Sequence, residues 1–122
     1  MTPTYILLSV ADVPTSRDFY HDLLGYRPIE DSQTFCLFVL ENGMKLGLWD
    51  ERGMTPPIQG TGGFEFGIPV DSEDEVDRVA ADWLARGISI IQPPVTMDFG
   101  RTFTALDPDG HRLRVLHPGT QP

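Results

Sequence analysis

The sequence DFGRTFTALDPDGHRLRVL, residues 98–116, predicts a β-hairpin. Two runs of strand-forming residues flank the turn Asp-Pro-Asp-Gly, in which Pro108 fixes φ and Gly110 accepts a positive φ. Arg114 stands in the middle of the second run, between two apolar residues, where a simple buried strand would not place a guanidinium group. The group that Arg114 faces is therefore the main question about function.

The rest of the chain predicts two similar series of elements. Each half contains a strand, a helix and three further strands, and a hairpin turn joins the last two strands (Asn42-Gly43 in the first half). Ser72 and Glu75 have the spacing of a capping box. The predicted strands cover residues 4–10, 26–30, 33–40, 44–49, 64–70, 88–92, 102–106 and 112–116; the predicted helices start near 12–16 and at 72 and stop at Gly25 and Gly87.

Size and composition narrow the classes of function. The 122 residues suit one domain, and the formal net charge of −9 argues against nucleic acid and against an anionic membrane surface as partners. No apolar run is long enough to span a bilayer, and the N-terminus has no basic region typical of a secretory signal. The single cysteine, Cys36, suits a reducing cytoplasm and is interpreted as a small buried hydrophobe.

The alternation of strand residues separates an apolar face from a mixed face. The mixed set includes Tyr5, Gly47 and Trp49, with Glu65 and Arg114 in the second half. Counting across the turn places Phe103 opposite Arg114, and Phe103 and Arg101 then share its face. Glycines, aromatic rings and a few charges are typical of a ligand cavity, whereas the alternative is an ordinary solvent-facing side of a sheet.

The repeated β-α-β-β-β order resembles the vicinal oxygen chelate superfamily of glyoxalases, extradiol dioxygenases and bleomycin-resistance proteins. The resemblance rests on the motif VADVxxSxxFYxxxLG at 10–25 and on DPDGH at 107–111, and it covers nearly the whole chain. It implies an α+β fold in which two βαβββ modules form a cup-shaped mixed sheet with the helices on the outer face. The expected boundaries are one domain over 1–122, with module one at 1–50, a Gly- and Pro-rich linker at 51–62 and module two at 63–118.

The same resemblance allows a test for metal. Metal-using members place ligands at four inward strand positions, which fall on Tyr5, Gly47, Glu65 and Arg114. Only Glu65 is a usual ligand, and Arg114 is a permanent cation, so no metal and no cofactor are expected. Glu65 and Arg114 are instead expected to pair with each other, either to recognise a ligand or only to close the floor of the cup. The three histidines are interpreted as surface residues.

Within the superfamily, the motif FGRTF at 99–103 and Trp49 look most like the phenazine-antibiotic resistance proteins, which bind drugs without converting them. The resemblance implies a cytoplasmic homodimer that sequesters a planar aromatic molecule and is not an enzyme. The alternative is a metal-dependent glyoxalase- or dioxygenase-type enzyme of the same superfamily. Whether the modules pair within one chain or are swapped between chains stays open. The predicted ligand-binding residues are Tyr5, Phe35, Gly47, Trp49, Glu65, Arg101, Phe103 and Arg114.

Overall fold

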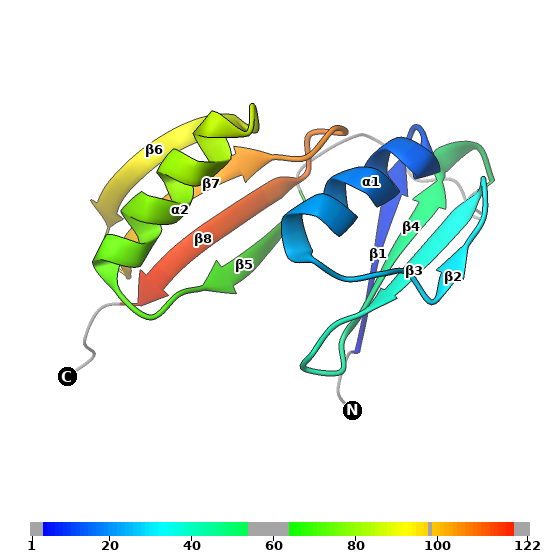
Figure 1. Ribbon diagram of the computed structural model, residues 1–122, viewed down its shortest axis with the longest axis horizontal. Helices are drawn as coiled ribbons and strands as arrows, with labels where there is room; N and C mark the ends of the chain where they lie inside the picture. Colours follow the sequence, from blue (N-terminus) through cyan, green and yellow to red (C-terminus); the bar gives the residue numbers. More distant parts are fainter. Residues whose placement is uncertain (1–3, 54–63, 98, 119–122) are drawn as a thin grey trace. The chain divides into compact units, whose positions relative to one another are not determined.

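The computed structural model describes residues 4–53, 64–97 and 99–118 (Figure 1). The chain divides into two units, Met1–Thr61 and Gly62–Pro122, and the described residues of each form one α-helix and one four-stranded sheet. Most of the predicted linker at 51–62, including its glycine-rich end, lies outside the described residues. Its first three residues form a short 3-10 helix, η1, over Glu51–Gly53.

The first unit follows the predicted order of elements. Its strands are β1 (Tyr5–Val10), β2 (Glu30–Asp31), β3 (Phe35–Val39) and β4 (Lys45–Asp50), and its helix is α1 (Val13–Leu24). The sheet order is β1-β4-β3-β2, with β1 parallel to β4 and the other pairs antiparallel. Helix α1 packs on one face of this mixed sheet, against β3 and β4 (Figure 1).

The second unit repeats this topology. It contains β5 (Glu65–Pro69), α2 (Glu73–Ala85), β6 (Ser89–Met97), β7 (Gly100–Leu106) and β8 (Arg112–Pro118). The sheet order is β5-β8-β7-β6, with β5 parallel to β8. Helix α2 packs on one face of the sheet, so the predicted α+β fold with two βαβββ modules is confirmed (Figure 1).

The helices begin and end where the sequence predicts. A carboxylate oxygen of Asp12 accepts a hydrogen bond from the Thr15 amide at 3.0 Å, and this satisfies an otherwise unpaired donor at the start of α1. Ser72 does the same for α2, since its hydroxyl accepts from the Glu75 amide at 3.1 Å. Gly25 ends α1 with φ of 80°, a conformation that favours glycine.

Each unit has its own apolar core between helix and sheet. In the first unit the fully buried side chains include alternate positions of β1 and β4, Cys36 and Phe38 of β3, and Val13 and Tyr20 of α1. In the second unit Phe103, Leu113 and Val115 are fully buried beneath α2. Burial of these apolar side chains supplies the main favourable term in folding of each unit.

Two predicted strands differ from the structure. The strand predicted at 26–30 is reduced to the two residues of β2, because only Glu30 and Asp31 pair with β3. The strand predicted to stop at Pro93-Pro94 instead continues to Met97. A proline is tolerated there because β6 is the edge strand of its sheet, and the register shifts between Ile90 and Val95. Within the described ranges, no helix has the length and apolar character needed to cross a membrane.

Candidate functional site

Three aromatic side chains lie on the face of the first sheet that is turned away from α1. Tyr5, Phe35 and Trp49 occupy alternate positions to the buried residues of β1, β3 and β4. The rings of Phe35 and Trp49 meet edge to face, with centroids 6.2 Å apart. The Lys45 ammonium lies 5.0 Å from the centroid of Tyr5. We call Tyr5, Leu7, Phe35, Gly47 and Trp49 the aromatic face.

Side chains of the aromatic face pack closely over the backbone of Gly47. A Cβ atom at this position would lie 2.5 Å from Cδ2 of Leu7 and 3.3 Å from the ring of Phe35. Gly47 pairs with Leu7 on β1 and with Leu37 on β3, so it lies between these two leucines in the sheet. Tyr5 and Leu7 are 56% and 44% exposed, which leaves apolar surface of this sheet uncovered within the unit.

Asp50 fixes the chain directly after Trp49. Its buried carboxylate accepts hydrogen bonds from the Arg52 backbone amide at 2.9 Å and from the Arg52 guanidinium at 3.0 and 2.7 Å. The Arg52 hydrogen bonds lower the pKa of the Asp50 carboxyl to about 2.

The same core face carries Cys36, and burial raises the pKa of its thiol to about 11, which agrees with a role as a small buried hydrophobe.

In the second unit, Arg114 lies at the centre of a polar network. Its guanidinium donates to Glu65 through Nε at 3.0 Å and through Nη2 at 3.5 Å, so the predicted pair with Glu65 is present. Nη1 donates to Oε1 of Gln92 and to the Thr102 hydroxyl, both at 3.3 Å. We call Glu65, Gln92, Thr102 and Arg114 the arginine network.

Further contacts hold the arginine network in place. The Thr104 hydroxyl donates to Oε1 of Gln92 at 3.0 Å, and the Thr102 hydroxyl donates to the carbonyl of Val115 at 2.9 Å. The Phe99 ring lies 5.7 Å from the Arg114 guanidinium carbon, within the range of a cation–π contact. The Arg114 side chain is only 19% exposed, and most of its N–H groups donate to other protein groups.

The predicted position of Phe103 is wrong. Phe103 pairs with Val115, Thr104 pairs with Arg114, and Ala105 pairs with Leu113. The hairpin closes through the bond from the Asp107 amide to the His111 carbonyl, which leaves three loop residues, the last of them Gly110 with φ of 86°. This loop shifts the pairing by one residue and turns Phe103 to the helix side, where its buried ring meets Trp83 at 5.2 Å.

Arg101 follows Phe103 to the helix side of the sheet. Its Nε donates to the Asp77 carboxylate of α2 at 2.9 Å, and Nη1 donates to the Thr96 hydroxyl at 3.2 Å. The prediction that Arg101 shares a face with Arg114 is therefore wrong. The ion pair of Arg101 with Asp77 links β7 to α2.

The positions expected for metal ligands do not fit a divalent metal. Gly47 offers no side-chain donor, and Arg114 is a cation whose guanidinium already takes both oxygens of Glu65. Among the described residues there is no group of three or more His, Cys, Asp or Glu side chains able to hold an ion. Of the three histidines, His21 is exposed as predicted, whereas His111 is buried against Phe64 and His117 is half-buried.

Three residues that contact the Arg114 side chain were not predicted. Gln92, Thr102 and Phe99 reach Arg114 from β6, from β7 and from the residue before β7. The register shift of β7 would have revealed Thr102, because a three-residue loop moves it onto the Arg114 face. Gln92 lies at a bulge of β6, and nothing in the sequence fixes that irregularity.

Comparison with known proteins identifies the family of the chain. The family model described as the Glyoxalase/Bleomycin resistance protein/Dioxygenase superfamily matches residues 2–115. The phenazine antibiotic resistance protein EhpR of Enterobacter agglomerans is 31% identical over 119 residues, which cover 94% of this chain and 91% of EhpR. The chain therefore belongs to the glyoxalase/bleomycin resistance/dioxygenase superfamily.

Solved structures show the same fold. Protein ATC0852 from Agrobacterium tumefaciens, known from solution NMR, is 46% identical with a TM-score of 0.91, over 98% of this chain and 99% of that one. Lactoylglutathione lyase from Agrobacterium tumefaciens has a TM-score of 0.78 over 95% of this chain and 92% of that one. At 18% identity, this second likeness concerns the fold alone.

Proposed function

We propose that the protein binds and sequesters a planar aromatic small molecule, such as a phenazine antibiotic, without converting it. The observation that carries the proposal is the aromatic face, where Tyr5, Phe35 and Trp49 lie on one side of the sheet. The relationship to EhpR, a phenazine antibiotic resistance protein, supports the choice of ligand class.

Binding would depend on stacking and apolar burial. A flat aromatic ligand can lie against Trp49 with offset or edge-to-face ring contacts, each worth about 0.5–1.5 kcal/mol beyond burial of the area itself. The edge-to-face contact with Phe35 limits rotation of the Trp49 ring, which lowers the entropy lost on binding. The exposed ring of Tyr5 supplies further apolar surface.

Polar recognition is proposed for the arginine network. Glu65 is its more exposed charged member, at 36% of the side chain against 19% for Arg114. Glu65 would therefore meet the polar atoms of a ligand, while Arg114 holds the carboxylate in orientation. Phe103 and Arg101 have no part in the proposed site, because both lie on the helix side of the sheet.

A binding role without catalysis is favoured over a metal-dependent enzyme by the chemistry of the residues at the four ligand positions. Elemental analysis of the purified protein separates the two functions. Binding of a phenazine by protein that holds no stoichiometric metal supports sequestration, whereas a tightly held stoichiometric metal would contradict it.

The protein is further proposed to act as a homodimer in the cytoplasm. Exposed large apolar side chains are present in both units, among them Tyr5 and Leu7 in the first and Leu84 in the second. A second copy is the simplest partner able to cover such surfaces. Sedimentation equilibrium with and without phenazine would give the mass, and a monomer under both conditions would contradict a dimeric site.

Isothermal titration with phenazine tests the proposed function. Trp49→Ala is expected to weaken binding at least tenfold, because the main stacking surface is lost. Trp49→Phe is the matched control, since it retains an aromatic ring and should recover most of the affinity. If Trp49→Ala binds phenazine as tightly as the parent, the aromatic face is not the binding site.

A further inference from the structure

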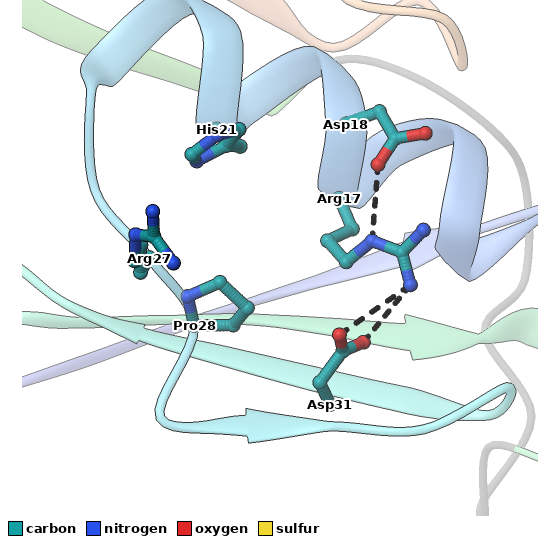
Figure 2. A pocket seen from close by; sticks show the side chains of 6 residues that line it. All are labelled: Arg17, Asp18, His21, Arg27, Pro28 and Asp31. Atoms are coloured by element: carbon teal, nitrogen blue, oxygen red, sulfur yellow. Dashed lines mark hydrogen bonds and ion pairs between the residues drawn. The ribbon is translucent and has the colours of Figure 1, made fainter.

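A pocket of about 400 Å³ lies in the first unit between α1, β2 and the segment that joins them. Arg17, Asp18 and His21 come from α1, Asp31 comes from β2, and Arg27 and Pro28 come from the connection (Figure 2). The pocket lies on the helix side of the sheet, whereas the aromatic face lies on the opposite side. Its chemistry is therefore independent of the proposed function.

One end of the pocket carries an excess negative charge. Arg17 pairs with Asp18 through Nε at 3.1 Å and with Asp31 through Nη1 at 3.1 Å (Figure 2). One guanidinium thus faces two carboxylates, and one negative charge is left over. Each carboxylate has acceptor positions beyond those that Arg17 occupies, and Asp18 is 68% exposed.

The other end carries Arg27, a cation without a partner in the described part of the chain. Six other arginines form ion pairs there, and Lys45 lies over Tyr5, which leaves Arg27 and Arg112 as the basic residues without a described side-chain contact. The sequence has 18 acidic against 9 basic residues, so an unpaired arginine beside a pocket is unexpected. Its planar fork suits a carboxylate, which it can bind through two parallel hydrogen bonds.

His21 adds a directional group beside Arg27 (Figure 2). Its Nδ1 lies 2.9 Å from the Tyr26 carbonyl oxygen, and a carbonyl only accepts, so Nδ1 carries a proton. The hydrogen bond ties the ring to the connection that carries Arg27. Nε2 is then the ring atom left for a ligand.

We infer that this pocket binds a small zwitterion of the α-amino acid class. The carboxylate of the ligand would lie on the Arg27 fork, and its ammonium group would lie at the Asp18 and Asp31 end. A pocket with separated opposite charges and no large net charge favours a ligand with the same separation. A dianion such as phosphate would meet the two carboxylates and is disfavoured.

Three probes test this inference, and two of them are L-alanine without one of its charged groups. L-alanine carries both charges, propionate lacks the ammonium group and ethylammonium lacks the carboxylate. Titrations followed by ¹H–¹⁵N NMR should give saturable shifts for L-alanine at the amides around Arg27 and Asp31, with at least tenfold weaker binding of the other two. Propionate binding as tightly as L-alanine, or L-alanine giving no saturable shift, would overturn the inference.

Substitutions test the two ends separately. Arg27→Gln should weaken L-alanine binding at least tenfold, and Asp18→Asn should weaken it several-fold; both side chains are exposed. Arg112→Gln in the second unit is the matched control, since it removes the other arginine without a described partner, and it should leave binding unchanged. Unaltered binding by Arg27→Gln, or an equal loss in Arg112→Gln, would reject the site. Phenazine binding should be the same in all three variants, so this test fails or succeeds apart from the proposed function.

Discussion

Each unit has one pair of parallel strands, β1 with β4 and β5 with β8, and each pair contains a glycine at its third position. The glycine belongs to the second strand of the pair in the first unit and to the first strand in the second unit. In the first unit the third residues of β1 and β4 pair as Leu7 with Gly47, and in the second unit those of β5 and β8 pair as Gly67 with Arg114. Each pair combines one large side chain with one glycine. In the first unit the glycine makes room for the Leu7 side chain of the edge strand, whereas in the second unit a Cβ atom at Gly67 would meet only Leu116.

This exchange separates the chemistry of two sheets that share one topology. Around Gly47 the neighbours are rings and methyl groups, which favour a flat apolar ligand. Around Arg114 the neighbours are a carboxylate, an amide and a hydroxyl, which accept hydrogen bonds from the guanidinium. A repeated fold thus supports two kinds of surface when small residues change places.

The largest expected effect concerns Phe103, which the register places in the core of the second unit. Phe103→Ala should lower the free energy of unfolding by about 3–5 kcal/mol, the usual cost of such a cavity. Phe35→Ala is the comparison in the first unit and should cost less, since Phe35 is only half-buried. Urea denaturation measures both, and a cost for Phe103→Ala below that of Phe35→Ala would contradict the assignment of faces.

The next effect concerns the arginine network. Arg114→Met should lower the free energy of unfolding by about 1–2 kcal/mol, because it leaves Glu65 without its partner in a partly solvated site. The double variant Glu65→Gln, Arg114→Met should recover part of the loss in a double-mutant cycle. The cycle also needs the single variant Glu65→Gln, and a double-variant cost equal to the sum of the two single-variant costs would show that the two side chains do not couple.

A smaller effect on stability is expected from Gly47→Ala. The added methyl group meets Cδ2 of Leu7, an exposed and mobile end, so the free energy of unfolding should fall by only about 1 kcal/mol. The methyl group would displace Leu7 on the aromatic face, where the ligand is proposed to lie, so phenazine affinity should fall about tenfold. Gly67→Ala is the control, since its Cβ would meet only Leu116 at an ordinary 3.4 Å.

The smallest effect concerns Asp50 and acid. The pKa of this carboxyl in the folded protein is about 2, below its ordinary value, so the folded state favours the ionised form. Its contribution to stability is complete above about pH 4 and is lost as the pH falls towards 2. Thermal melts of Asp50→Asn should show a weaker dependence on pH in this range than the parent, and identical profiles would contradict the assignment.

Much of the fold could be predicted because local signals agreed with the topology. Asp12 and Ser72 cap the helices, and Gly25 ends the first of them, as the patterns indicated. The pair of Glu65 and Arg114 followed from strand periodicity together with the family pattern. These features depend on short spacings or on the alternation of two faces.

The errors came from strand register and strand irregularity. One extra loop residue at Gly110 moved Phe103 and Arg101 to the other face, because the side-chain period of a strand is two. The strand over Ser89–Met97 passes two prolines, which only its edge position allows. The pocket beside Arg27 depends on how α1 approaches β2, and no local sequence signal describes that packing.

The packing of Phe103 against Trp83 has a consequence for spectroscopy. The chain has two tryptophans, one in each unit, and Trp83 is 6% exposed while Trp49 lies on the open aromatic face. A phenazine stacked on Trp49 would quench the emission of that indole by direct contact. The buried indole of Trp83 would keep emitting at shorter wavelength, so one emission spectrum contains both the signal of occupancy and an internal reference for folding.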